Sequence, residues 1–174
     1  PDECFDGIGS TPGAPPCTSP AIPKVNQAYV WGLTGGAAGA IFGTTANMLC
    51  IVPGMVAEEL SFTLPAFQMA NVVCEFGESQ TNPGNMGDWR APQFFYYDYL
   101  TQQTTELTPG GTLVNDTWGI RAAGMKGSLV LFGGPSLTGG INLFAFNAST
   151  KAFIGEVNLP AYYDIRRFER NGTQ

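Results

Sequence analysis

Short apolar runs, rich in aromatic and β-branched residues, recur along the chain from residue 25 onward. Gly, Pro or Asn bounds most of them, as in "AIFGTT", "QFFYYDYLT", "SLVLFGG" and "INLFAFN". Runs of this length between turn residues are typical of β-strands, and no window keeps apolar residues at helical spacing for three turns. The pattern therefore predicts an all-β chain.

The strand pattern repeats along the chain with a period of about 45 residues. Leu-Pro or a near form closes successive units, with spacings of 44 and 51 residues, at Pro65, Pro109 and Pro160. The openings of the units are spaced by 43, 44 and 46 residues, near Trp31, Cys74, Trp118 and Asp164. Two local matches support the repeat: "NASTKAF" aligns with "DYLTQQT" at an offset of 49, and "IFGT" with "LFGG" at an offset of 90. Units of this length favour four short strands each, which is what one propeller blade needs.

Two hairpins, "FFYYDYLTQQTTEL" and "LFAFNASTKAFIGEV", carry a resemblance to a known architecture. They resemble the outer-strand hairpins of WD40-like and quinoprotein-like β-propellers, where an aromatic strand, an Asp or Asn and a polar turn lead into the next strand. The resemblance covers residues 25–174, and the overall pattern is similar to secreted propeller proteins of unassigned role. It implies about three four-stranded blades, with the start of a fourth at "YYDIRRFERNGTQ".

A set of three blades and a fraction does not close a ring, because each blade needs a neighbour on both faces. We therefore expect the chain to be part of a larger ring. The remaining blades would come from a longer chain or from other protein chains. A longer chain is favoured, because "RNGT" stops in the middle of a hairpin.

Residues 1–24 differ in composition from the rest of the chain. They hold six of the 13 prolines and two of the four cysteines. Such a segment has no core of its own, so we expect an irregular, Pro-rich arm that is pinned by a disulfide and contains no regular element.

The four cysteines favour disulfides over a metal site. No C-x-x-C spacing occurs and the chain has no histidine, which argues against zinc. The pairs nearest in sequence are favoured, Cys4 with Cys17 and Cys50 with Cys74, and buried free thiols are the alternative.

The chain also carries three N-x-[ST] sequons, at Asn115, Asn147 and Asn171. Sequons and disulfides together indicate an oxidising compartment, so we expect a secreted, extracellular glycoprotein. The absence of an initial Met and of a signal sequence leads us to expect a processed mature chain.

Composition excludes several classes of partner and chemistry. The formal net charge is −6 and 13% of residues are charged, so no basic patch is available for nucleic acid. No apolar run approaches the roughly 20 residues of a membrane span. The absence of histidine removes the commonest general base and the usual transition-metal ligand. We expect neither a metal nor a cofactor.

The candidate site residues gather in "CEFGESQTNPGNMGDWRAPQ". The carboxylates and the arginine there are candidates for catalysis, namely Glu75, Glu78, Asp88 and Arg90. Paired carboxylates can hydrolyse glycosides, and Trp89 could stack on a sugar ring. The structural alternatives are that Trp89 covers a blade edge, that Asp88 and Arg90 form a surface pair, and that both glutamates are solvated.

These observations favour an extracellular binding or structural module, with carbohydrate as one class of ligand. A carboxylate-dependent glycan-active enzyme, a glycosidase or lyase that uses the Glu75–Arg90 region, is the alternative, and a cofactor-dependent oxidoreductase ranks third.

"GGPSLTGG" predicts a loop between strands, since it lacks the Gly-Lys-Ser/Thr ending of a P-loop. The run "IRRFER" predicts a solvated edge, with anion binding by Arg166, Arg167 and Arg170 as the alternative.

Overall fold

The computed structural model describes residues 3–5, 16–18, 22–24, 29–46 and 90–169. The chain divides into two compact units, of which the first comprises Pro1–Tyr29 with Ala46–Arg90 and the second Val30–Thr45 with Ala91–Gln174. In the first unit, β1 (Glu3–Phe5) pairs antiparallel with β2 (Ile22–Lys24). The expectation of no regular element in residues 1–24 is therefore wrong. Both strands of a two-stranded pair are edge strands, and an edge strand tolerates the missing N–H of Pro23.

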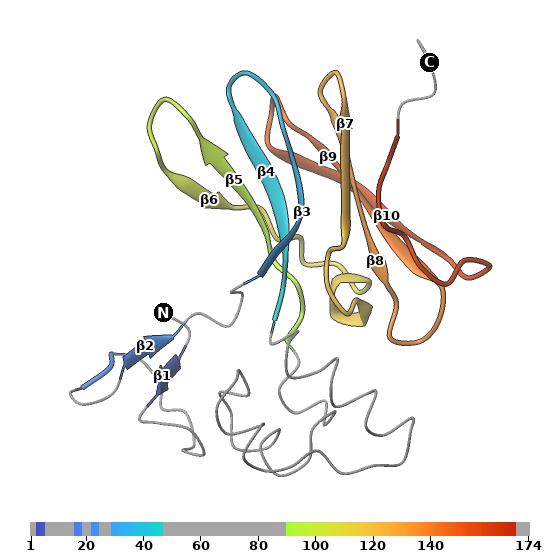
Figure 1. The fold of residues 1–174 in the computed structure, drawn as a ribbon, viewed down its shortest axis with the longest axis horizontal. Helices are drawn as coiled ribbons and strands as arrows, with labels where there is room; N and C mark the ends of the chain where they lie inside the picture. The colour runs from blue at the N-terminus through green and yellow to red at the C-terminus, as the bar shows by residue number, and fades with distance from the viewer. Residues whose placement is uncertain (1–2, 6–15, 19–21, 25–28, 47–89, 170–174) are drawn as a thin grey trace. The chain divides into compact units, whose positions relative to one another are not determined.

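The second unit contains two four-stranded antiparallel sheets, which confirms the all-β prediction (Figure 1). The first sheet consists, in spatial order, of β3 (Tyr29–Gly35), β4 (Gly39–Thr45), β5 (Phe94–Asp98) and β6 (Thr104–Glu106). The second consists of β7 (Ala122–Lys126), β8 (Leu129–Pro135), β9 (Ile141–Asn147) and β10 (Ala152–Leu159). A short 3₁₀ turn, η2 (Val114–Asp116), lies between them in the sequence.

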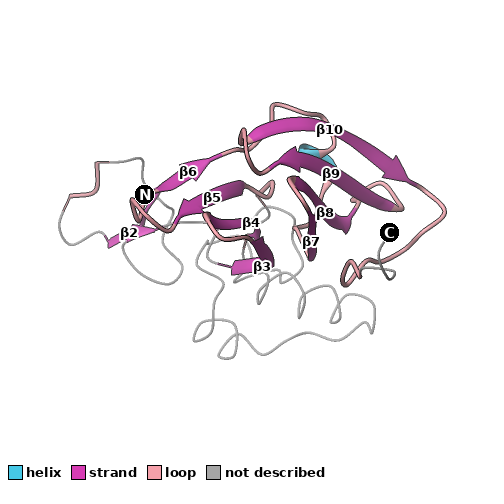
Figure 2. Cartoon of the chain, turned by 90° about the horizontal axis from the view of Figure 1, so that it is seen from above, coloured by secondary structure: helices cyan, strands magenta, loops and turns pink. Residues whose placement is uncertain are grey.

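Each sheet is a meander in which strands adjacent in sequence are adjacent in space. Seen from above, β3 and β7 lie close to each other, while β6 and β10 lie far apart (Figure 2). Figure 1 shows the same divergence from the other direction. The two sheets therefore fan out from the side of their first strands.

The division into repeat units differs from the sequence prediction at one boundary. β4 pairs with β5 from Gly39↔Asp98 to Gly43↔Phe94, so strands expected in the first and second units share one sheet. An opening near Cys74 therefore does not separate these strands. A second difference is that "YYDIRRF", expected as a strand, belongs to no sheet among the described residues.

The hydrophobic core lies between the two sheets. Cross-strand partners share a face, so Gly43 and Phe94 of the first sheet point to the same side, as do Phe132 and Phe144 of the second. Phe94 is fully buried, and its ring centroid lies 5.0–5.1 Å from three rings of the second sheet, those of Phe132, Phe144 and Phe146. Tilted aromatic pairs at this distance stabilise a core beyond their buried area.

Glycines allow a close approach beside this aromatic core. A Cβ built on Gly43 would lie 2.5 Å from Cβ of Ile120, and one on Gly32 would lie 2.9 Å from Cγ2 of the same residue. Ile120 is fully buried. The glycines of β3 and β4 therefore leave room for Ile120 and the segment that leads into β7. We call this position, where an apolar side chain packs directly on strand glycines, the seat of the first sheet.

The outward face of the second sheet carries a similar seat. Residues 161–169, which we call the strap, follow β10 and lie against this face. A Cβ on Gly133 would lie 3.0 Å from two methyl carbons of Ile165, and one on Gly124 would lie 2.6 Å from Cβ of Phe168. The strap thus meets β8 and β7 through two apolar side chains.

Among the described residues, no helix is long and apolar enough to cross a membrane.

Candidate functional site

Most of the candidate residues taken from the sequence lie outside the described part of the chain. These are Glu75, Glu78, Asp88, Trp89, Cys50, Cys74 and Asn171. Arg90 is described and half-buried, four residues before β5. The roles of these carboxylates therefore stay predictions.

The segment that carries these candidates has a defined place in the sheet order. It lies within residues 46–93, between the second and third strands of the first sheet. At the corresponding place in the second sheet, residues 136–140 suffice to connect β8 with β9. Segments that connect the strands of a rigid scaffold are the usual carriers of binding residues.

The described part of the chain contains a polar cluster at that same connection of the second sheet, which we call the Asp116 cluster. Its members come from η2, the β8–β9 turn and the second-sheet strands, and they are Asp116, Thr117, Ser136, Thr138, Asn142 and Asn158. The Ser136 hydroxyl donates to Oδ2 of Asp116 at 2.5 Å, and the Thr138 N–H donates to Oδ1 at 3.1 Å. The aspartate thereby holds the β8–β9 turn closed.

Asn142 connects this turn to the sheet. Its side chain is fully buried, and its Nδ2 lies 2.9 Å from Oγ1 of Thr117 and 3.1 Å from the carbonyl oxygen of Asp116. Its Oδ1 accepts a hydrogen bond of 2.8 Å from Nδ2 of Asn158 on β10. A buried amide needs such partners, because an unsatisfied one destabilises the fold.

The pKa of Asp116 reflects two opposing causes. Burial favours the neutral acid and acts to raise the pKa, whereas hydrogen bonds from Ser136, Asn142 and Thr138 stabilise the carboxylate. The hydrogen bonds outweigh burial, so the pKa lies below its ordinary value of 3.8. The carboxylate is thus kept ionised and occupied by protein donors, and it serves as a fixed structural anchor.

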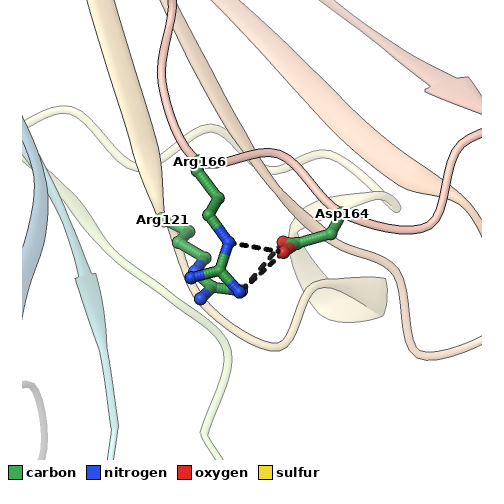
Figure 3. Close-up of polar contacts among 3 residues, drawn as sticks. All are labelled: Arg121, Asp164 and Arg166. Carbon is green, nitrogen blue, oxygen red and sulfur yellow. Dashed lines mark hydrogen bonds and ion pairs between the residues drawn. The ribbon is translucent and has the colours of Figure 1, made fainter.

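A second polar group links the strap to the start of the second sheet (Figure 3). Nη1 of Arg121 lies 2.9 Å from both oxygens of Asp164, and Nε of Arg166 lies 3.2 Å from Oδ2. The Arg121 guanidinium also lies over the ring of Trp31 on β3, 4.9 Å from its centroid. Arg121 therefore bridges the first strand of the first sheet and the strap.

The basic run in the strap is paired within the described residues. Arg166 binds Asp164, and Arg167 forms an ion pair with Glu169. The side chains of both arginines are more than 70% exposed, so these pairs are solvated. The arrangement agrees with the predicted solvated edge for these two residues, while Arg170 lies outside the described part.

Two of the sequons can be placed. Asn115 is exposed in η2, and Asn147 ends β9, where its Oδ1 accepts hydrogen bonds from the N–H groups of Ser149 and Thr150. Cys17 is not a free thiol in the structure, but its partner is not described. Glycosylation and the pairing of Cys4 with Cys17 remain predictions.

The described residues contain no cluster of three His, Cys, Asp or Glu side chains that could hold a metal ion. Sequence reasoning interpreted "GGPSLTGG" correctly as a connection between strands, but it missed the Asp116 cluster. One signal was present: Asn142 is a polar residue inside the otherwise apolar run "INLFAF". Comparisons of the chain with protein-family models and with curated proteins found no match.

Proposed function

We propose that the two sheets are successive blades of a β-propeller that acts as a secreted binding or interaction module. The observation that carries this proposal is the repetition of the sheet in side-chain detail. Asp98 and Asn147 end the third strands, and each accepts hydrogen bonds from the N–H groups two and three residues later. Gln102 and Lys151, at the same place in the two turns, have positive φ angles of 56° and 59°.

The packing between repeats supports the same proposal. Ile120 fills the seat at Gly43 of the first sheet, and Ile165 lies at Gly133 of the second. Gly43 and Gly133 occupy equivalent places in β4 and β8. Side chains that recur in this way are expected when each sheet docks on the next around a ring, which is the arrangement of a propeller.

We assign ligand binding to residues 46–93. This segment is the largest departure from the repeat, and it holds Trp89, whose indole could stack on a sugar ring. Trp89→Ala should therefore weaken binding of glycans by at least tenfold in an intrinsic-fluorescence titration against a glycan panel. Tyr163→Ala is the matched control, since Tyr163 is an aromatic residue with 90% exposure in the strap. Equal losses in both variants, or none in either, would contradict the assignment.

The alternative is a glycan-active enzyme, because the same segment contains Glu75, Glu78 and Asp88. Asp88→Asn and Glu75→Gln distinguish the two functions. A binding module retains its glycan affinity and forms no product with any member of the panel. An enzyme of the retaining or inverting type would lose turnover in one or both variants while it still binds.

A further inference from the structure

The aromatic side chains that dock the second sheet on the first recur on the opposite face of the first sheet. On the second sheet they are Phe132 of β8 with Phe144 and Phe146 of β9, all three fully buried. At equivalent places of the first sheet stand Phe42 of β4 with Phe95 and Tyr97 of β5. We call this second set the outward triad.

The outward triad faces away from the core of the second unit. Phe42 and Phe95 are cross-strand partners with stacked rings, 5.5 Å between centroids, and both alternate with residues that point into the core. Leu33 on β3 is 59% exposed and alternates with Gly32, which faces Ile120, so it extends the same face. Each residue of the triad is half-buried.

The second sheet presents the complementary half of the interface. Its outward face repeats the seat of the first sheet, with Gly133 in place of Gly43 and Leu143 in place of Phe94. The strap covers the part over β7 and β8 and leaves beside Phe168 a hollow of about 410 Å³, whose lining includes Leu129 and Leu131 of the outward face and extends to Thr34 of β3. Val157, which pairs with Leu143, is 50% exposed.

We propose that the outward triad is a docking surface for a second copy of this chain, and that the strap controls this association. The chain carries both halves of an interface that it already forms internally, so a head-to-tail contact between copies would repeat the contact between its own sheets. Ile165 occupies the place that the incoming first strand would need. The Asp164 contact with Arg121 holds the strap there, and its release frees the seat. This inference rests on the proposed blade repeat.

A head-to-tail contact that closes into a ring leaves neither face uncovered. An assembly of defined size is therefore expected, in contrast to open-ended aggregation.

The experiment releases the strap by Ile165→Ser with Phe168→Ser and measures mass by sedimentation equilibrium over a hundredfold range of concentration. We expect the strap-released protein to form an assembly of defined size, with an apparent Kd at least tenfold lower than that of the wild type. Phe95→Asp, or the milder Tyr97→Lys, should return it to a monomer. Tyr163→Ser is the control that alters the strap without touching the seat, and circular dichroism establishes that each variant is folded.

Folded, strap-released protein that stays monomeric would overturn the inference, as would an assembly that persists with Phe95→Asp. Wild-type association that Phe95→Asp abolishes and that strap release does not strengthen would support the docking surface and overturn the role of the strap. Glycan binding that depends on Trp89 would stand in either case, so failure here is distinguishable from failure of the proposed function.

Discussion

The two four-stranded sheets share a backbone plan but differ at the connection between their second and third strands. In the second sheet a tight turn, held by Asp116, joins β8 to β9. In the first sheet the chain passes through residues 46–93 before it returns as β5. A four-stranded sheet can form with either the short or the long connection, because the register of its strands is fixed by the alternation of buried and outward side chains along each strand. Function can therefore vary at this connection without altering the sheets.

The two faces of the first sheet also differ from each other in how deeply their aromatic residues are buried. Its inward face holds Phe94, which is completely buried among three phenylalanines of the second sheet. Its outward face holds Phe95, which is half-buried and stacked on Phe42. Phe94 and Phe95 are neighbours on β5 but pack on opposite faces of the sheet, and substituting each one measures how much its ring contributes to the free energy of unfolding.

The largest expected effect is that of Phe94→Ala. It removes a ring that contacts three others and leaves a cavity in the core, so the free energy of unfolding should fall by about 3–5 kcal/mol. Phe95→Ala, the matched control on the other face, should reduce it by about 1–2 kcal/mol, because the ring is only partly buried. Urea denaturation followed by circular dichroism measures both. Equal losses would mean that the outward face is packed as tightly as the core.

The next effect concerns the Asp116 cluster. Asn142→Ala removes the Nδ2 donor to the Asp116 carbonyl oxygen and to Oγ1 of Thr117, together with the Oδ1 acceptor of the Asn158 amide. Because these contacts are buried, the free energy of unfolding should fall by about 2–3 kcal/mol. Asn158→Ala, at the rim of the cluster, should have a smaller effect of about 1 kcal/mol. Should Asn142→Ala prove neutral in the same denaturation assay, the β8–β9 turn would not depend on the cluster.

The alternation of apolar residues was sufficient to predict β4, β5, β8, β9 and β10, and the two local matches at offsets of 90 and 49 join strands that are equivalent in the structure. The pairing of β4 with β5 could not be obtained in this way. It joins residues separated by a long segment, and periodicity contains no information on which distant strand supplies the partner hydrogen bonds. The predicted unit opening near Cys74 lies outside the described residues and stays a prediction.

The candidate site shows a similar limit. Glu75, Glu78, Asp88 and Trp89 were grouped into one candidate site because they lie in one stretch of sequence, and all four lie outside the described residues. The Asp116 cluster was not predicted, since Asp116, Ser136 and Asn142 are brought together only when η2 packs against the β8–β9 turn. A polar residue in an apolar strand signals a buried hydrogen-bond network, but it does not identify the partners.

A third substitution pair tests whether the two glycine-lined seats are equivalent. Gly43→Ala places a methyl group 2.5 Å from Cβ of the fully buried Ile120, which cannot move without displacing the core, so a loss of about 1–3 kcal/mol is expected. Gly133→Ala meets two methyl groups of Ile165 at 3.0 Å and Cδ2 of Leu143 at 3.1 Å, and the strap can shift outward, so a smaller loss of about 0.5 kcal/mol is expected. The free energy of unfolding from urea titrations gives the difference. A larger loss for Gly133→Ala would indicate that the strap is as rigid as the core.

The smallest expected effect distinguishes the two hairpin turns, which have the same geometry and differ in one titratable group. The Asp98 carboxylate accepts hydrogen bonds from the N–H groups of Thr101 and Leu100 and lies 4.0 Å from Nζ of Lys151, whereas Asn147 accepts the equivalent bonds with a neutral amide. The backbone hydrogen bond from Thr101 is the main cause that lowers the pKa of Asp98 below 3.8.

A carboxylate whose pKa is lowered in the folded state contributes stability above the unfolded pKa, and this contribution is lost as the pH falls through the folded value. Stability of the wild type should therefore decline below about pH 4, and Asp98→Asn should reduce that decline slightly while changing little at pH 7. Asn147→Asp, the reciprocal change, should add a small acid-dependent term of the same sign, because the new carboxylate would accept the same two N–H groups. Thermal unfolding between pH 2.5 and 7 measures both variants, and an unchanged acid slope in each would show that the turn bonds do not depend on the charge of their acceptor.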